Sequence, residues 1–168
     1  MREIWLREHL DLRMVLFRIL PTGIRRGFVE LVPQSMTLCR IHTEMGPGAP
    51  GVFRDDVLNN WLLRQNPSEF AYKAALDNFR RSCAGWCVAT YVLGIGDRHS
   101  DNILVKSSGQ VFHIDFGKYM GDWQMAAGFR RDRVPFVLTQ EMVNVVNAGA
   151  AFNTAYFQLF VVMIIYNI

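Results

Sequence analysis

Two short stretches of this 168-residue sequence carry side chains that could do chemistry together. The first contains Asp97, Arg98, His99 and Asn102, and the second contains Asp115. Amide and carboxylate oxygens, as in Asn102 and Asp115, are the hard ligands that divalent cations prefer. A histidine such as His99 can accept or relay a proton near neutral pH. Phosphoryl transfer uses this combination, with cations beside the phosphates, a group near the attacking hydroxyl, and fixed positive charge.

The residues between Asn102 and Asp115 predict a β-hairpin that would bring these two side chains together. Residues 103–105 and 111–114 are short apolar runs of the kind found in strands, and a polar, glycine-containing segment over 106–110 joins them. A hairpin returns its end beside its start. The turn before the first strand and the turn after the second could therefore meet at one metal site.

The rest of the chain reads as mainly α-helical. Amphipathic spacing and capping residues indicate helices over residues 3–20, 35–44, 55–65, 68–93, 140–147 and 154–166. Ser68 is the expected N-cap of the longest helix, and Gly85 is a candidate for a break in it. A β-branched run over residues 28–32 predicts a strand. Residues 46–51 predict a loop, and residues 116–138, without periodicity, predict a mobile loop.

Composition narrows the class of protein. The chain is 51% hydrophobic, which supports one domain with a sizeable core, and its net charge of +3 is too small to argue for a nucleic-acid partner. The chain has three cysteines, and an odd number argues against a disulfide framework and for a reducing compartment. Cys83 and Cys87 are four residues apart in an apolar stretch, so we expect two small buried side chains on one helix face.

An isolated Asp-Arg-His or Asp-Phe-Gly triplet is a weak signal, but their combination at this spacing is specific. Asp97-Arg98-His99 with Asn102, followed by Asp115-Phe116-Gly117, resembles the catalytic domain of phosphoinositide 3- and 4-kinases and their protein-kinase relatives. Ordinary protein kinases carry the reverse order, His-Arg-Asp. The chain resembles in particular the class II phosphoinositide 3-kinases, the C2-domain-containing type. The stretches that carry this resemblance are residues 10–14, 29–33, 66–68, 82–85, 87–94, 112–118 and 131–136.

The resemblance implies a fold, which is mainly α with a small β component: the C-lobe of a protein-kinase-like fold. Residues 1–168 would be part of the catalytic domain, with a hinge at about 28–34, a catalytic loop at 94–102 and an activation loop at about 115–138. It also implies roles for individual residues. These would be Asp97, Arg98 and His99 in catalysis, with His99 assisting deprotonation of the inositol 3-hydroxyl; Asn102 and Asp115 for Mg²⁺; Glu30, Val32, Leu104 and Ile114 for ATP; and Lys118, Arg130, Arg131 and Arg133 for the lipid headgroup.

The activation loop narrows the expected substrate. Class I enzymes carry an additional basic run in the middle of this loop. The run is absent here, which resembles class II enzymes. The resemblance therefore implies phosphatidylinositol or its 4-phosphate as the lipid. It also implies a cytoplasmic protein that works peripherally at membranes, either the plasma membrane or endosomal and vesicular membranes.

One departure from the family pattern concerns the phosphate side of the site. A kinase uses a phosphate-covering loop and a lysine in its N-lobe, yet the 28 residues before Val29 contain neither. We therefore expect the N-lobe other than the hinge, and the accessory domains, to belong to a larger parent protein, and this chain alone to be inactive. Two alternatives stay open: a truncated, catalytically inactive regulatory or binding module, and a related large Ser/Thr protein kinase.

Overall fold

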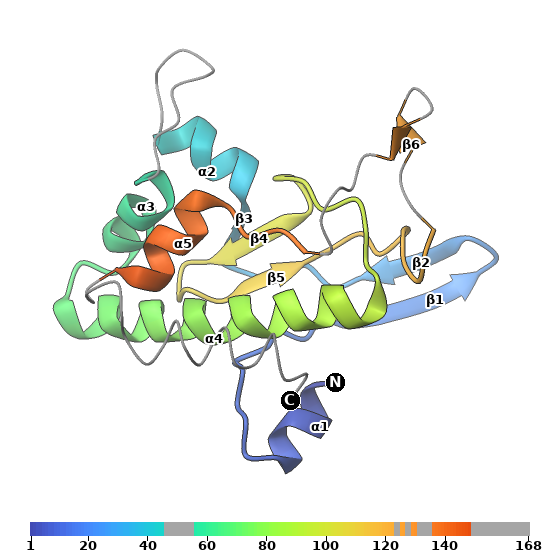
Figure 1. Ribbon diagram of the computed structural model, residues 1–168, viewed down its shortest axis with the longest axis horizontal. Coiled ribbons are helices and arrows are strands. Elements are labelled where there is room, and N and C mark those ends of the chain that lie inside the picture. The colour runs from blue at the N-terminus through green and yellow to red at the C-terminus, as the bar shows by residue number, and fades with distance from the viewer. Residues whose placement is uncertain (46–55, 123–124, 127–128, 131–135, 149–168) are drawn as a thin grey trace.

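The computed structural model describes residues 1–45, 56–122, 125–126, 129–130 and 136–148 and is rich in helix, with small antiparallel sheets (Figure 1). Its elements in chain order are α1 (Arg2–Arg7), β1 (Ile19–Gly23), β2 (Arg26–Val29), β3 (Ser35–Thr37), α2 (Leu38–Met45), α3 (Val57–Gln65), α4 (Glu69–Leu93), β4 (Ile103–Lys106), β5 (Val111–His113), β6 (Met125–Ala126), β7 (Phe129–Arg130) and α5 (Gln140–Asn147). Among these residues, no helix combines the length and the apolarity that a membrane crossing would require.

Helix α4 is the axis of the molecule and runs along most of its length (Figure 1). Its predicted N-cap is confirmed, because the Ser68 hydroxyl accepts a hydrogen bond from the Ala71 amide at 3.2 Å. The helix ends at Gly94, whose φ of 56° is the left-handed conformation that glycine adopts without strain. The C-terminal half of α4 is buried from Ser82 to Thr90, so other elements pack around it here.

The predicted break at Gly85 is wrong, and the glycine has a different use. Helix α4 is continuous through this position. A Cβ on Gly85 would lie 2.6 Å from the Met14 sulfur and 3.2 Å from Leu12 Cδ1. The missing side chain therefore lets residues 12–14 cross the helix at close range. Cys83 and Cys87 are buried free thiols in the same part of α4, as predicted, and the pKa of Cys83 is raised by its hydrogen bond with Cys87 and by burial.

The helix predicted over residues 3–20 is also wrong for most of its length. Only α1 is helical, and His9 and Arg13 take left-handed φ values of 60° and 52° that end any helical path. Leu12 is buried in the core instead. The apolar residues of this stretch are thus placed by contact with α4 and not by helical periodicity.

Strands β3, β4 and β5 form an antiparallel sheet that lies against α4. The predicted hairpin is confirmed, with Ile103 opposite His113 and Val105 opposite Val111. Strand β3 pairs with β4 on its other side. The expected helix from Ser35 therefore begins only at Leu38, because the backbone before it is used in the sheet.

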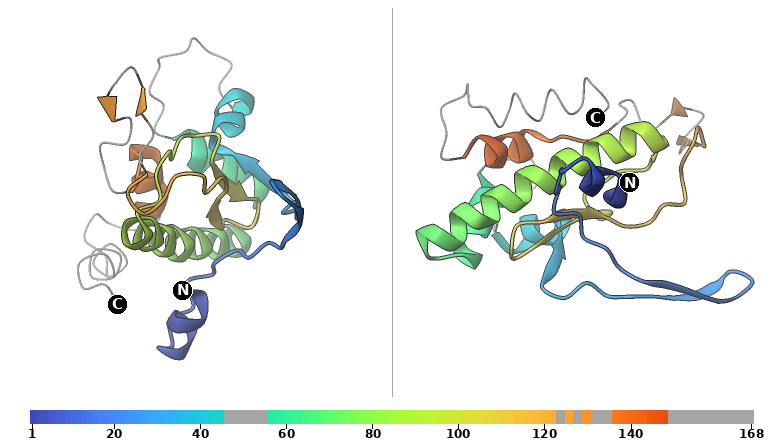
Figure 2. Two further views of the ribbon diagram at one scale, coloured as in Figure 1. Left: turned by 90° about the vertical axis from the view of Figure 1, so that its right-hand side faces the viewer. Right: turned by 90° about the horizontal axis from the view of Figure 1, so that it is seen from below.

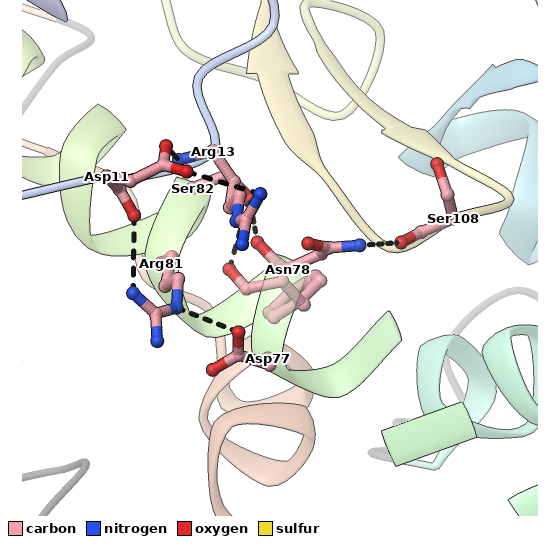
Figure 3. Close-up of polar contacts among 8 residues, drawn as sticks. Asp11, Arg13, Asp77, Asn78, Arg81, Ser82 and Ser108 are labelled. Carbon is pink, nitrogen blue, oxygen red and sulfur yellow. Dashed lines mark hydrogen bonds and ion pairs between the residues drawn. The ribbon is translucent and has the colours of Figure 1, made fainter. Parts of the chain in front are cut away.

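Two polar contacts hold the β4–β5 hairpin on α4, and Figure 3 shows the one between Asn78 and Ser108. The Ser82 hydroxyl accepts a hydrogen bond from the Val111 amide at 2.8 Å, and the Asn78 side-chain amide donates to the Ser108 carbonyl at 2.8 Å. Gly109 has a φ of 96°, and a Cβ there would lie 2.1 Å from the Ala75 carbonyl oxygen. The turn can approach the helix this closely only with glycine.

The β1–β2 hairpin extends away from the rest of the molecule (Figure 2). The predicted strand at 28–32 overlaps the observed β2 only at Phe28 and Val29. Every residue of both strands is exposed. The apolar side chains of Ile19, Leu20, Phe28 and Val29 are among them. The hairpin is thus ordered by its own backbone ladder.

Helices α2, α3 and α5 gather near the N-terminal end of α4 (Figure 1). The His42 imidazole joins α2 to α5, with Nε2 at 2.9 Å and 2.8 Å from the two carboxylate oxygens of Glu141. Helix α5 matches the prediction for 140–147. The predicted loop 46–51, the helix 154–166 and the expected cap Asp55 lie outside the described residues, and Asp56 is the N-cap residue of α3.

Candidate active site

The β4–β5 hairpin brings the two chemical stretches of the sequence to one place. The Ile114 amide donates to the Asn102 carbonyl at 3.1 Å, one step beyond the Ile103–His113 pair. Asn102 therefore begins the hairpin at the point where Asp115 ends it. The juxtaposition expected from hairpin geometry is present in the structure.

The predicted catalytic loop, residues 94–102, is a turn whose backbone is held by hydrogen bonds from the Asn102 side chain and main chain. The Asn102 amide group donates through Nδ2 to the Asp97 carbonyl at 2.9 Å, and its backbone N–H donates to the His99 carbonyl at 2.9 Å. Asp97 and Asp115 both take left-handed φ values, 57° and 58°. Such values in residues other than glycine need support from their surroundings, and the closed turn supplies it at Asp97.

Arg98 supplies the support at Asp115. Its side chain is buried, with 8% of the residue exposed. Nε donates to the Gly96 carbonyl at 2.7 Å, Nη1 donates to the Ile114 carbonyl at 2.7 Å, and Nη2 donates to the Asp115 carbonyl. Its guanidinium carbon also lies 5.8 Å from the centre of the Phe116 ring. Arg98, predicted as catalytic, thus joins the catalytic loop to the Asp-Phe-Gly turn through backbone carbonyls.

His99 lies partly exposed at the edge of the same turn. Its Nδ1 accepts from the Asp101 amide at 3.3 Å and lies 3.6 Å from the Asp101 carboxylate. Both contacts use Nδ1. A neutral ring whose Nδ1 accepts from the Asp101 amide carries its hydrogen on Nε2. Nε2 could accept a proton from a substrate in the other tautomer, which carries its hydrogen on Nδ1, beside the Asp101 carboxylate.

Asn102 and Asp115 fit a divalent cation by the chemistry of their free oxygens. The hydrogen bond from Asn102 Nδ2 orients its amide and leaves Oδ1 as an acceptor. Asp115 is exposed, and its Oδ1 accepts from the Gly117 amide at 3.3 Å. No group of three or more His, Cys, Asp or Glu side chains arranged for a metal occurs in the described part of the chain. A cation here would therefore be held by the Asn102 amide oxygen, the Asp115 carboxylate and oxygens of a bound molecule that the chain itself does not supply.

The residues predicted to contact adenine belong to two regions. Leu104 and Ile114 alternate with the residues that face α4, so they lie on the opposite face of the hairpin together with Phe112. Glu30 follows β2, where its amide donates to the Arg18 carbonyl at 2.9 Å and its carboxylate accepts from the Arg18 amide at 2.9 Å. Val32 is partly buried, and its carbonyl accepts from the Ser35 hydroxyl at 2.7 Å.

Backbone hydrogen bonds join the start of the predicted activation loop to the end of α4 and to the predicted catalytic loop. The Gly96 amide donates to the Lys118 carbonyl at 2.8 Å, and the Met120 amide donates to the Leu93 carbonyl at 3.0 Å. The Lys118 ammonium pairs with the Asp122 carboxylate at 3.1 Å.

The remaining residues predicted to read the lipid headgroup are less fully placed. Arg130 belongs to β7, which pairs with β6. Arg131 and Arg133 lie outside the described residues.

A stack of three rings at the Asp-Phe-Gly turn, with Trp86 and His113 buried and Phe116 partly buried, was not apparent from the sequence. Trp86 stacks on His113 at 4.6 Å and on Phe116 at 5.9 Å between ring centres. Burial and the charge of Arg98 lower the pKa of His113 to about 3, so this histidine is neutral at neutral pH. His113 therefore has a packed, structural role in this stack. Its partner Trp86 gave no sequence signal, because a tryptophan in an apolar helix is ordinary.

Comparison with known proteins shows the family of this chain. A family profile described as "Phosphatidylinositol 3- and 4-kinase" matches residues 1–166. The chain belongs to this family, and its domain is that of a kinase, a transferase.

Individual relatives place the chain beside C2-domain-containing phosphatidylinositol 3-kinases. It is 62% identical over 161 residues to "Phosphatidylinositol 3-kinase piki-1" of Caenorhabditis elegans, covering 96% of this chain and 10% of that protein. It is 57% identical over 161 residues to "Phosphatidylinositol 4-phosphate 3-kinase C2 domain-containing subunit alpha" of Pongo abelii, covering 96% and 9%. It is 52% identical over 149 residues to the human "C2 domain-containing subunit beta", covering 89% and 9%. The chain thus spans about a tenth of the length of these relatives.

Proposed function

We propose that this chain forms the metal-binding and proton-accepting side of a lipid kinase that phosphorylates the inositol 3-hydroxyl of phosphatidylinositol or phosphatidylinositol 4-phosphate. The observation that carries the proposal is the meeting of His99, Asn102 and Asp115 at one end of the β4–β5 hairpin. The names of the relatives support 3-phosphorylation of such lipids. The kinase-like C-lobe is the architecture we propose for the region around α4.

Each residue has a distinct part in this proposal. ATP would supply the transferred phosphoryl group, and Mg²⁺ would neutralise charge on the phosphates. Asn102 and Asp115 would hold the cation through their side-chain oxygens. His99 would take the proton of the attacking hydroxyl at Nε2, in the tautomer that carries its hydrogen on Nδ1 next to the Asp101 carboxylate. Arg98 would keep the Asp115 backbone in place and would not contact the reacting atoms.

The backbone after β2 supports a role as adenine-binding hinge. Within the described residues, the Glu30 amide and the Val32 carbonyl are used in internal hydrogen bonds, whereas the Glu30 carbonyl and the Val32 amide are not. One acceptor and one donor, two residues apart in the chain, suit the edge of an adenine ring. Leu104 and Ile114 would contribute apolar surface below it.

We place the protein in the cytoplasm, peripherally bound at the plasma membrane or at endosomal and vesicular membranes. The argument is chemical, because an enzyme that modifies a phosphoinositide must reach a membrane surface. Lys118, Arg130, Arg131 and Arg133 are the proposed contacts to the headgroup phosphates, since lysine and arginine form charge-assisted hydrogen bonds with phosphate.

The decisive experiment is His99→Ala in the complete parent protein, assayed for 3-phosphorylation of phosphatidylinositol in vesicles. Loss of a general base costs roughly 10²- to 10⁴-fold in turnover, so we expect near-complete loss of product. His42→Gln is the matched control, because His42 contacts Glu141 on α5 and lies outside the site. Unchanged turnover in His99→Ala would rule out His99 as the proton acceptor, and phosphorylation of protein but not lipid would favour a Ser/Thr protein kinase.

The 168-residue chain should be assayed beside the parent protein. No lysine occurs before Val29, and phosphoryl transfer needs fixed positive charge near the phosphates. We therefore expect the chain alone to turn over poorly. Turnover equal to that of the parent would contradict this expectation.

A further inference from the structure

Trp86 contacts the segment that carries Asp115 on both sides of that residue. It stands on α4 and is only 9% exposed. Its ring stacks on His113, the last residue of β5, with 4.6 Å between the ring centres and 22° between the ring planes. It also stacks on Phe116, with 5.9 Å between the centres and 7° between the planes. One side chain of the helix thus holds a ring that precedes Asp115 and a ring that follows it.

The backbone between these two rings has a conformation that needs support. Asp115 takes a φ of 58°, which costs free energy in residues other than glycine. Arg98 supports it through the carbonyls of Ile114 and Asp115, and its guanidinium carbon lies 5.8 Å from the centre of the Phe116 ring. Trp86 supports it from α4 by stacking at both ends of the same turn. The two supports are therefore chemically different and act on one short segment.

The ring stack bears on where the Asp115 carboxylate lies. The Ile114 amide donates to the Asn102 carbonyl at 3.1 Å, so Asp115 turns away from β5 directly across the hairpin from Asn102. Stacked aromatic rings stabilise a conformation beyond the area that they bury. Without the stack, Asp115 could relax to the negative φ values that residues other than glycine prefer. Its carboxylate would then move relative to Asn102.

We propose that Trp86 is a positioning residue for the cation site, because its ring stack keeps the Asp115 carboxylate beside Asn102. The inference rests on the proposed function, in which these two residues hold Mg²⁺. Trp86 acts through the rings of His113 and Phe116 and touches neither the cation nor ATP. A tryptophan that only filled the core would contribute to stability and would have no selective effect on cation binding.

Binding of ATP with and without Mg²⁺ separates these two roles. The measurement is calorimetric titration of the complete parent protein with ATP, once with Mg²⁺ and once with EDTA. We expect Trp86→Leu to weaken binding of Mg²⁺–ATP by about threefold to tenfold, the worth of one aromatic stack, and to leave binding of metal-free ATP nearly unchanged. Trp86→Phe keeps a ring and should retain most of the affinity. Equal weakening in both titrations of Trp86→Leu, or no weakening, would overturn the inference.

Trp61→Leu is the matched control. Trp61 is 3% exposed on α3 and makes the same change of an indole to an isobutyl group on a different helix. We expect its affinity for ATP to equal that of the unmodified protein, both with Mg²⁺ and with EDTA. A selective loss with Mg²⁺ in this variant as well would show that the effect does not depend on the ring stack, and the inference would fail.

Phe116→Leu removes the same contact from the other side. Phe116 is only partly buried, so this variant should fold even where Trp86→Leu does not, and circular dichroism verifies both. We expect the same selective loss of Mg²⁺–ATP binding. The double variant should lose no more than either single variant, because both changes break one contact. Additive losses, or no selective loss in Phe116→Leu, would contradict the proposal.

Asp115→Ala distinguishes failure of this inference from failure of the proposed function. It removes the carboxylate assigned to Mg²⁺, so the affinity for ATP should fall further than in Trp86→Leu, and only with Mg²⁺ present. If Asp115→Ala is selective and Trp86→Leu is not, the inference fails and the proposed cation site stands. If Asp115→Ala shows no selective loss, the proposed cation site fails and the inference fails with it.

Discussion

Two regions of the molecule differ in how their residues are held. One is the body, by which we mean α4, the β3–β5 sheet and residues 94–117, and the other is the β1–β2 hairpin. In the body, buried polar groups such as Arg98, Asn102 and Ser82 have hydrogen-bond partners within the chain. In and next to the hairpin, Ile24 is 93% exposed and Phe28 is 70% exposed. The geometry of His99, Asn102 and Asp115 is thus fixed by contacts inside this chain, whereas the segment that leads to Glu30 is held mainly by a two-stranded ladder.

Of the two halves of the proposed site, the one with His99, Asn102 and Asp115 can therefore be studied in the isolated chain. The predicted catalytic loop and the Asp-Phe-Gly turn are supported by α4, the β4–β5 hairpin and each other. A two-stranded hairpin alone is marginally stable in water. Variants in the body should therefore change the stability of the whole chain, and variants in the hairpin should not.

The largest effect is expected from Arg98→Ala. The change removes hydrogen bonds to the carbonyls of Gly96, Ile114 and Asp115. Hydrogen bonds to a charged group are worth about 1.5–3 kcal/mol each, so the free energy of unfolding should fall by about 3 kcal/mol or more. Denaturant unfolding of the 168-residue chain measures this.

Two controls separate the buried network from charge as such. Arg81→Ala removes an exposed arginine that pairs with Asp77 (Figure 3), and exposed pairs contribute about 0–1 kcal/mol. Arg98→Lys keeps the charge but cannot donate to the same carbonyls, so it should behave like alanine. Full stability in Arg98→Lys would show that the fork of hydrogen bonds is not what holds the turn.

Ser82→Ala should have the next largest effect. The Ser82 hydroxyl is fully buried and accepts from the Val111 amide, so its loss leaves a buried N–H unpaired. Such a loss costs about 1–3 kcal/mol. Hydrogen exchange should show faster opening at Val111 than at residues of α3. Protection of Val111 equal to that in the unmodified chain would mean that the hairpin is held by its packing alone.

Acid should destabilise the body through His113. The pKa of His113 in the folded state is about 3, against 6.5 as its usual value. Between these two pH values the unfolded chain binds the extra proton, so stability is full above pH 6.5 and falls as the pH drops. The slope from this group approaches about 1.4 kcal/mol per pH unit. Unfolding measured from pH 7 to pH 4 should show it.

His113→Phe is the comparison for the acid effect. Phenylalanine can stack on Trp86 and cannot be protonated. The pH dependence of its free energy of unfolding should be shallower by about one proton over this range. An identical slope in both proteins would assign the acid sensitivity to other groups.

The smallest effect is expected in the hairpin. Phe28→Ser should change the free energy of unfolding by no more than about 0.5 kcal/mol, because the side chain is exposed. Phe112→Ser is the matched control in the body, where the ring is buried, and it should cost about 3 kcal/mol or more. A large loss in Phe28→Ser would show that the hairpin packs more tightly than its exposure indicates.

The sequence by itself determined the features that depend on local pattern. The long helix from Ser68, the β4–β5 hairpin and the meeting of Asn102 with Asp115 follow from capping, alternation and hairpin return, and they were predicted. The family followed from the residue types at Asp97 to Asn102 and at Asp115 to Gly117.

Tertiary contacts decided the rest. Residues 3–20 show helical spacing of apolar side chains, yet residues 12–14 are not helical, and Gly85 lets them cross α4 at close range. Arg98 belongs to the motif predicted as catalytic, yet its side chain donates hydrogen bonds to the backbone carbonyls of Ile114 and Asp115, which follow β5. Local sequence specifies which conformations a segment prefers. Only packing against distant residues sets which of them is adopted and which polar groups remain available for chemistry.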